Sequence, residues 1–310
     1  MQPIRTTCSS ERRILSRMEY TLAHGTANDF VVLADLDDQH PLSAQLTRAL
    51  CDRRRGVGAD GVLRLAPGDG DAQVFMDHRN ADGSTAEMCG NGVRVVAKYV
   101  VDHGIVAPDA DGSLRIGTRS GVKRVQIHRD GHGLVAEVSV DMGSPILDPV
   151  EVPFETGDPT ASTHEVELPG GSVELSVVSM GNPHGVLLVD DVARAPVADL
   201  GARLETHPRF PAKANIGFAQ VLGGAELKLR VWERGVGETA ACGTGACAAV
   251  VALHRRGLVD DEVVVHLPGG VLHVSYRPGG TVIMTGPAVE IATGRLAPAW
   301  LTHATDPDAR

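Results

Sequence analysis

The sequence is poor in aromatic residues and contains no long apolar run. Only 3% of its 310 residues are Phe, Trp or Tyr, and no stretch approaches the roughly 20 apolar residues that span a bilayer. A membrane-spanning chain is therefore not expected. Basic residues are scarce as well, with 29 Lys and Arg against 39 Asp and Glu and a net charge of −10. Because a nucleic-acid backbone requires a basic surface, often with stacking aromatics, no nucleic-acid partner is expected.

Cysteine is also sparse, and its spacing argues against two common structural roles. The cysteines are odd in number, form no C-x-x-C pair and have no His-rich motif beside them. Neither a disulfide framework nor a zinc site is therefore expected. We expect a reduced, cytoplasmic protein that binds no metal. The five cysteines are Cys8, Cys51, Cys89, Cys242 and Cys247.

The N-terminal segment lacks the apolar core of a secretory signal peptide. Residues 1–17 are basic and contain Ser and Thr, and we expect them to form a disordered extension. A first strand is predicted from Met18 onward, in MEYTLAHGTANDFVVL. With 43% apolar residues, the chain suits one large domain or two domains of about 150 residues.

The chain does contain an internal repeat. CGNGVRVVAKYVVDHG at 89–104 and CGTGACAAVVALHRRG at 242–257 both open on Cys-Gly-x-Gly, continue as apolar runs and close on Gly. Such runs predict a buried helix after each cysteine, and the final Gly suits a helix C-cap. An upstream landmark repeats too, since Asn80 and Glu233 each lie nine residues before their cysteine.

Two more asparagines extend this match toward the N-terminus. Asn28 and Asn182 precede the two cysteines by 61 and 60 residues, each in a turn followed by an apolar, strand-like run. The matched offsets predict two homologous α/β halves, each with a sheet wrapped around its apolar helix. We expect these halves at 18–147 and 148–286, with a C-terminal segment at 287–310 that returns to the first half.

Each of the two matched cysteines is expected at the N-terminus of its helix, followed by Gly-x-Gly. Free N–H groups and the helix dipole stabilise a thiolate there, so we expect the thiol pKa to fall from about 8.5 toward neutrality. Two such thiols across a cleft can remove a proton from one face of a carbon and return another to the opposite face. The sequence shows no strong cofactor motif. It therefore predicts cofactor-free racemisation or epimerisation.

Other interpretations of the cysteines must be weighed beside this one. A single cysteine before an apolar helix is most often inert core, although a matched pair within C-G-x-G argues against that. We interpret Cys247 as core. The alternative from another functional class is a binding or redox protein in which Cys89 and Cys242 form a regulatory disulfide.

At this point three motifs carry a resemblance to a known family. RNADGSTAEMCGNGVR, GNPHGV and WERGVGETAACGTG closely resemble the diaminopimelate epimerases, and the resemblance runs from about Met18 to about Pro287. It implies interconversion of LL- and meso-2,6-diaminoheptanedioate without pyridoxal phosphate, in lysine and peptidoglycan synthesis. It also implies two similar α/β domains, each a barrel-like, mostly antiparallel sheet around a central helix, with the active site in the cleft between them. Such chains often assemble as homodimers.

The resemblance assigns roles residue by residue. Cys89 and Cys242 resemble the two catalytic thiols, and His184 and Glu233 resemble polar residues placed beside them. Gly90-Asn91 and Gly243-Thr244 resemble the family's loops that receive the carboxylate at the reacting carbon. Six further residues resemble those with which the family binds the rest of its substrate: Asn28, Asn80, Asn182, Asn215, Glu233 and Arg234.

One position departs from the family pattern. Many members have Gln where this chain has Gly61 in GVGADG, so we expect that side-chain contact to substrate to be absent or replaced by water. The nearest rival function is a proline or hydroxyproline racemase, or another cofactor-free isomerase of the same fold. The pair Glu233-Arg234 favours a substrate with a second charged amino-acid end, because proline would leave these groups without partners.

Overall fold

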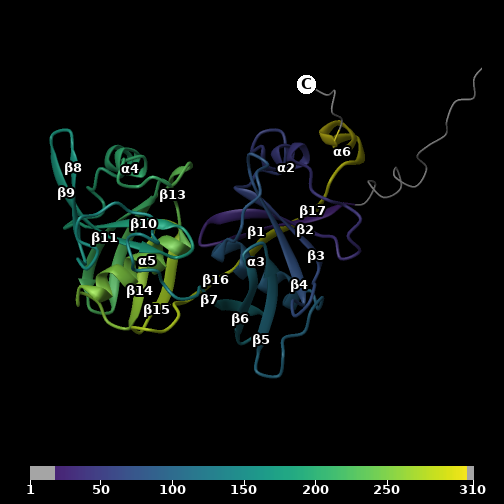
Figure 1. The fold of residues 1–310 in the computed structure, drawn as a ribbon. Helices are drawn as coiled ribbons and strands as arrows, with labels where there is room; N and C mark the ends of the chain where they lie inside the picture. The colour runs from purple at the N-terminus through teal and green to yellow at the C-terminus, as the bar shows by residue number, and fades with distance from the viewer. Residues whose placement is uncertain (1–17, 306–310) are drawn as a thin grey trace, which may run out of the picture.

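Two lobes of similar construction lie side by side in the computed structural model, which describes residues 18–305 (Figure 1). Each lobe is a curved sheet around one central helix, α3 (Gly90–Asp102) in the first and α5 (Gly243–Arg255) in the second. The expected extension at 1–17 lies outside the described residues.

Part of the sheet in the first half is buried on both faces. In β2 (Asn28–Ala34), alternate residues face α3, and the residues between them pack beneath the outer helix α2 (Ala44–Cys51). Ser43 begins α2, because its hydroxyl accepts the N–H of Leu46 at 3.0 Å. The other strands of this half are β1 (Glu19–Gly25), β3 (Gly61–Pro67), β4 (Val74–Asn80), β5 (Ser113–Thr118), β6 (Gly121–Arg129) and β7 (Val135–Asp141).

The second half repeats this plan around α5, with α4 (Val197–Glu205) packed on the outside against a second apolar cluster. Its strand pairings are mostly antiparallel, with parallel pairs only at β10–β11 and β12–β14 among those that the structure describes. The strands are β8 (His164–Leu168), β9 (Gly171–Ser179), β10 (Pro183–Leu188), β11 (Asn215–Gly223), β12 (Glu226–Glu233), β13 (Gly237–Thr239), β14 (Glu262–Leu267) and β15 (Gly270–Ser275).

The chain then crosses back to the first half through one shared strand. β16 (Ile283–Pro287) pairs with β15 of the second half on one edge and with β7 of the first half on the other. β17 (Val289–Arg295) next pairs with β1, and α6 (Pro298–Thr305) packs against α2. The two sheets are therefore joined by backbone hydrogen bonds at β7–β16.

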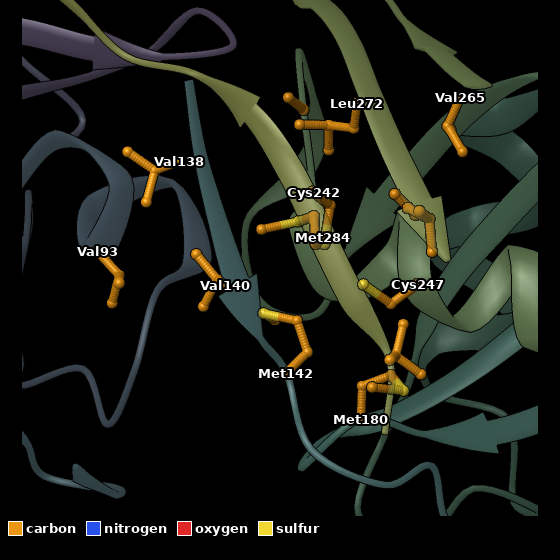
Figure 2. Close-up of a cluster of buried hydrophobic side chains, with 14 of the residues drawn as sticks. Val93, Val138, Val140, Met142, Met180, Cys242, Cys247, Val265, Leu272 and Met284 are labelled. Atoms are coloured by element: carbon orange, nitrogen blue, oxygen red, sulfur yellow. The ribbon is translucent and has the colours of Figure 1, made fainter. Parts of the chain in front are cut away.

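A single apolar core passes through this junction and surrounds both central helices. It contains most of α5, whose Ala, Val and Gly residues have the small side chains that let strands pack all around a helix. Figure 2 shows Met142 and Met284 between Val93 and Val140 of the first half and Cys242 and Cys247 of the second. The mostly antiparallel, two-lobed α/β fold expected from the sequence is thus confirmed. No helix among residues 18–305 is long and apolar enough to cross a membrane.

Candidate active site

Cys89 and Cys242 occupy the same position in the two halves. Each is the N-cap of a central helix of 13 residues, with extended backbone at φ −141° and −121°. The Cys89 sulfur accepts the N–H of Gly92 at 3.4 Å, and the Cys242 sulfur accepts that of Gly245 at 3.3 Å. A thiol here takes the place of the Ser or Asp oxygen that usually caps a helix. The helix starts predicted from the sequence are confirmed.

The two cysteine loops meet at Met284 of the shared strand. A Cβ on Gly90 would lie 2.8 Å from the Met284 Cε, and one on Gly243 would lie 3.0 Å from its sulfur. A side chain at either position would have to displace the flexible end of this methionine. A hydrogen bond also joins the loops, from the Asn91 amide to the carbonyl oxygen of Ala241 at 3.3 Å. The structure therefore brings both thiols to the junction of the halves.

The surroundings of Cys89 include a network of polar groups that orients Asn28. The Asn28 Oδ1 lies 3.8 Å from the Cys89 sulfur and accepts from the Asn91 amide at 3.2 Å. Its own Nδ2 donates to Asp60 at 3.0 Å, and Arg53 pairs with that carboxylate at 2.7 Å. Asn28 thus presents its oxygen to the thiol.

A different polar set surrounds Cys242. Its sulfur lies 3.5 Å from the Thr244 hydroxyl, which in turn accepts from the Asn182 amide at 3.5 Å. The Asn182 Oδ1 lies 3.0 Å from Nε2 of His184. Burial, together with the nearby Arg234, lowers the pKa of His184 to about 3, so the ring is neutral at pH 7.

Glu233 lies at the end of β12 beside Cys242 and bonds to the Thr239 hydroxyl. Burial raises the pKa of its carboxyl. The adjacent Arg234 donates its backbone N–H to Asn215 Oδ1 at 2.9 Å and its guanidinium to a backbone carbonyl at 3.0 Å. Asn215 is held from the other side by the carbonyl oxygen of Pro183 at 3.0 Å. These three predicted site residues therefore lie together.

The expected lowering of the thiol pKa values is wrong for this structure. Burial raises the pKa of both Cys89 and Cys242, and the Glu233 carboxylate raises them further. The helix N–H groups at Gly92 and Gly245 do lower both values, as the sequence argument assumed. This lowering does not offset the increase in pKa that results from the loss of water around each sulfur. The sequence does not reveal how far a sulfur is buried.

Asn80 and Gly61 pair with each other across β3 and β4. The exposed Asn80 side chain bonds to Ser84 at 3.0 Å. A Cβ at Gly61 would lie 2.7 Å from the carbonyl oxygen of Arg79 and 3.1 Å from Nε2 of His78. The imidazole of His78 thus occupies space beside Gly61, and the absence of a side-chain contact from this position to substrate stays a prediction.

Sequence reasoning also missed Arg94, which lies one turn beyond Cys89 in α3 and has no solvent exposure. Its guanidinium donates to Asn91 Oδ1 at 3.0 Å. The available signal was a single Arg within an apolar helix run, VRVVA. Among residues 18–305, no group of three His, Cys, Asp or Glu side chains is arranged to hold a metal ion.

Comparison with known proteins identifies the family of this chain. Residues 20–147 and 176–291 match the family description diaminopimelate epimerase. A protein of that name from Pseudomonas paraeruginosa is 48% identical over 282 residues, which cover 90% of this chain and 99% of the relative. This chain belongs to the diaminopimelate epimerase family. A member from Thioalkalivibrio sulfidiphilus is 44% identical over 284 residues, with coverage of 90% and 99%.

Solved structures share the fold of this diaminopimelate epimerase family member at much lower identity. A hydroxyproline epimerase from Agrobacterium vitis superposes with a TM-score of 0.67 at 15% identity, covering 91% of this chain and 92% of the other. A probable proline racemase from Agrobacterium radiobacter gives 0.66 at 17% identity, with 94% of each chain covered. These likenesses show the two-lobed fold alone.

Proposed function

We propose that this protein epimerises LL-diaminopimelate to the meso form without a cofactor, using Cys89 and Cys242 as the two acid–base groups. The observation that carries the proposal is the pair of equivalent thiols, each the N-cap of a central helix and each followed by a glycine that lies against Met284. Membership of the diaminopimelate epimerase family supplies the substrate.

The proposed reaction moves one proton off the α-carbon and another onto it. The thiolate of one cysteine takes the proton, so that the carbon–hydrogen electron pair becomes a carbanion delocalised into the adjacent carboxylate. The thiol of the other cysteine then donates its proton to the opposite face, which inverts the centre and leaves that sulfur as thiolate. The N–H groups of Asn91 and Thr244 lie in the first turns of the two helices, and the helix dipoles favour the negative charge on the carboxylate.

The rest of the expected site would hold the second amino-acid end of the substrate. In this proposal the carboxylate of Glu233 receives the distal ammonium, and the guanidinium of Arg234 binds the distal carboxylate. Asn215 supports this assignment because it bonds to the backbone of Arg234 at 2.9 Å and so fixes the start of that loop. The amides of Asn80 and Asn182 complete the set.

Burial of the two thiols suits this chemistry once substrate is bound. A sulfur whose pKa is raised by burial is a strong base when ionised, and the α-proton of an amino acid requires one. The neutral His184 contributes no charge near Cys242, although it fixes Asn182 at 3.0 Å. The positive charge that stabilises a thiolate must then come from the substrate ammonium, the helix N-termini and any buried cation nearby.

Assembly and setting form a further part of this proposal. We infer a cytoplasmic homodimer whose product enters lysine and peptidoglycan synthesis. β17 supports the dimer, since among described residues it pairs only with β1 and exposes Val289 and Ile291. Light scattering of the purified full chain tests this, and a monomer at micromolar concentration would contradict it.

Isotope exchange tests the central proposal. Incubation with LL-diaminopimelate in deuterated water and fresh thiol should place deuterium at one α-carbon as the meso product accumulates. Cys89→Ser and Cys242→Ser should each abolish most turnover, because each face requires its own acid or base. Exchange with proline but not with diaminopimelate would instead favour the racemase alternative. Near wild-type turnover by either serine variant would refute the two-thiol mechanism.

A further inference from the structure

Arg94 is a fully buried positive charge without a carboxylate partner. Its exposed fraction is 0%, and no ion pair to it is formed by any acid within residues 18–305. Its acceptors are all neutral: the Thr26 hydroxyl at 2.6 Å, Asn91 Oδ1 at 3.0 Å, the carbonyl of Pro287 at 3.2 Å and the sulfur of Met284 at 3.8 Å. An uncompensated buried cation is costly to a fold, so its position calls for a functional reason.

The partners of Arg94 come from both sides of the junction. Thr26 begins the tight turn between β1 and β2, with φ of 56°, and this turn leads directly into Asn28. Pro287 and Met284 belong to the shared strand β16. One guanidinium therefore ties the Cys89 helix, the Asn28 turn and the strand that connects the halves.

The bond from Arg94 to Asn91 has a specific consequence for the site. Because the guanidinium can only donate, the Asn91 oxygen must face it and the Asn91 NH₂ must point away. That NH₂ group then donates to Asn28 Oδ1 at 3.2 Å and to the Ala241 carbonyl at 3.3 Å. Asn28 Oδ1 lies against the Cys89 sulfur, and Ala241 directly precedes Cys242. The orientation of one amide thus affects both cysteine loops.

The charges that face Cys89 come from two elements. Glu233 on β12 raises the pKa of the thiol, whereas Arg94 on α3 lowers it. The thiols of Cys89 and Cys247 are the titratable groups that act on Arg94, and Cys247 is buried with a pKa raised to about 12, so it stays neutral. The cation therefore has no permanent anion to balance, and the Cys89 thiolate formed during turnover is the one that it can compensate.

We propose that Arg94 is a positioning residue of the two-thiol site, which fixes the Asn91 amide between the cysteine loops and stabilises the thiolate of Cys89 by its unpaired positive charge. This inference rests on the proposed function of Cys89. The role needs Arg in particular, because a Lys ammonium keeps the charge but cannot donate in the planar fork that reaches Thr26, Asn91 and Pro287 together.

The test compares Arg94→Met and Arg94→Lys in the full-length protein. Alkylation of Cys89 by iodoacetamide is followed by peptide mass spectrometry across pH, beside kcat and KM for LL-diaminopimelate. Arg94→Met should raise the alkylation midpoint by about one pH unit, which makes alkylation about tenfold slower below both midpoints. Arg94→Lys should keep the wild-type midpoint and lower kcat, because the Asn91 amide is no longer fixed. Arg124→Met, at an exposed arginine on β6, is the matched control and should change neither.

Each outcome decides the matter. A folded Arg94→Met protein with wild-type midpoint and kcat would overturn the inference. If Arg94→Met does not fold, the test rests on Arg94→Lys alone. An unchanged kcat or a displaced alkylation midpoint in Arg94→Lys overturns the inference. A lowered kcat at an unchanged alkylation midpoint supports it. Cys89→Ser separates the two proposals, because an active Cys89→Ser protein refutes the proposed function itself. If Cys89→Ser is inactive and Arg94→Met keeps the wild-type kcat and alkylation midpoint, only the role of Arg94 is refuted.

Discussion

Truncation of Met284 should lower both stability and turnover, because this side chain fills the space between the two cysteine loops. The residue is 0% exposed, and Met284→Ala removes its Cγ, Sδ and Cε atoms. At about 0.8 kcal/mol per buried methylene-sized group, the lost transfer free energy is about 2.4 kcal/mol. A remaining cavity of about 40 Å³ adds about 1 kcal/mol at roughly 24 cal/mol per Å³. We expect a loss of about 3 kcal/mol in the free energy of unfolding.

Turnover should fall in the same variant for a local reason. Gly90 and Gly243 both lie against Met284, so each cysteine loop loses the side chain that sets its position. Urea denaturation measures the free energy, and initial rates with LL-diaminopimelate measure kcat at a temperature where the protein is folded.

Two controls separate the local effect from general destabilisation. Met284→Leu conserves volume and should cost less than about 1.5 kcal/mol. Leu114→Ala, in the core strand β5 and also 0% exposed, should lose a similar free energy of unfolding yet keep wild-type kcat. If Met284→Ala loses under about 1 kcal/mol, or matches Leu114→Ala in kcat, the assigned role of Met284 is wrong.

Three further outcomes follow from buried polar groups. Because burial and Arg234 lower the pKa of His184 to about 3, this side chain binds a proton below about pH 6.5 in the unfolded chain but remains neutral in the folded one. The contribution of His184 to stability is therefore complete above about pH 6.5 and should fall by about 2 kcal/mol at pH 5. His184→Asn should remove this share of the decline in denaturation curves, whereas the share of buried His78, whose pKa is lowered to about 4, should remain. Asp35→Asn should cost about 1.5–3 kcal/mol by urea unfolding, because Arg64 loses one charged hydrogen-bond partner at 2.8 Å and keeps its ion pairs with Asp38 and Asp77. Gly61→Gln should lower kcat/KM and stability together, by about 1–3 kcal/mol of overpacking, and His78→Ala in the same chain should restore part of the loss.

Each of these has a result that contradicts it. A decline between pH 7 and pH 5 that is as large in His184→Asn as in the wild type would place His184 outside the set of proton-linked groups. Wild-type urea midpoints for Asp35→Asn would show that the Arg64 ion pair contributes nothing net. Strictly additive effects of Gly61→Gln and His78→Ala would mean that the imidazole does not occupy the space in question.

The repeat in the sequence was sufficient to predict the two halves and the two buried helices. Local signals carried this information, since Cys-Gly-x-Gly followed by an apolar run defines a helix start in each half. A strand pair follows the central helix in each half of the structure, β5–β6 in the first and β14–β15 in the second, in keeping with the repeat. Periodicity and turn residues are properties of neighbouring positions, which a sequence displays directly.

The features that the sequence did not predict depend on contacts between residues far apart in the chain. Arg94 meets Met284 and Pro287, which lie 190 and 193 positions away, and no spacing rule predicts such a meeting. The same limit explains the error on the thiol pKa values, because the helix start is local whereas burial of the sulfur depends on the whole junction. The sequence likewise did not reveal that the imidazole of His78 lies beside Gly61, because the two residues are on different strands.

The route of the chain through β16 constrains when the first half can be completed during synthesis. Its sheet gains β16 on one edge and β17 on the other, and both strands follow the whole second half in sequence. Leu301 of α6 closes the outer cluster of the same half, later still. On the ribosome, domains usually fold as units from the N-terminus onward. Here the first half must keep two strand edges open until β16 and β17 have emerged, so its final closure follows the synthesis of the second half.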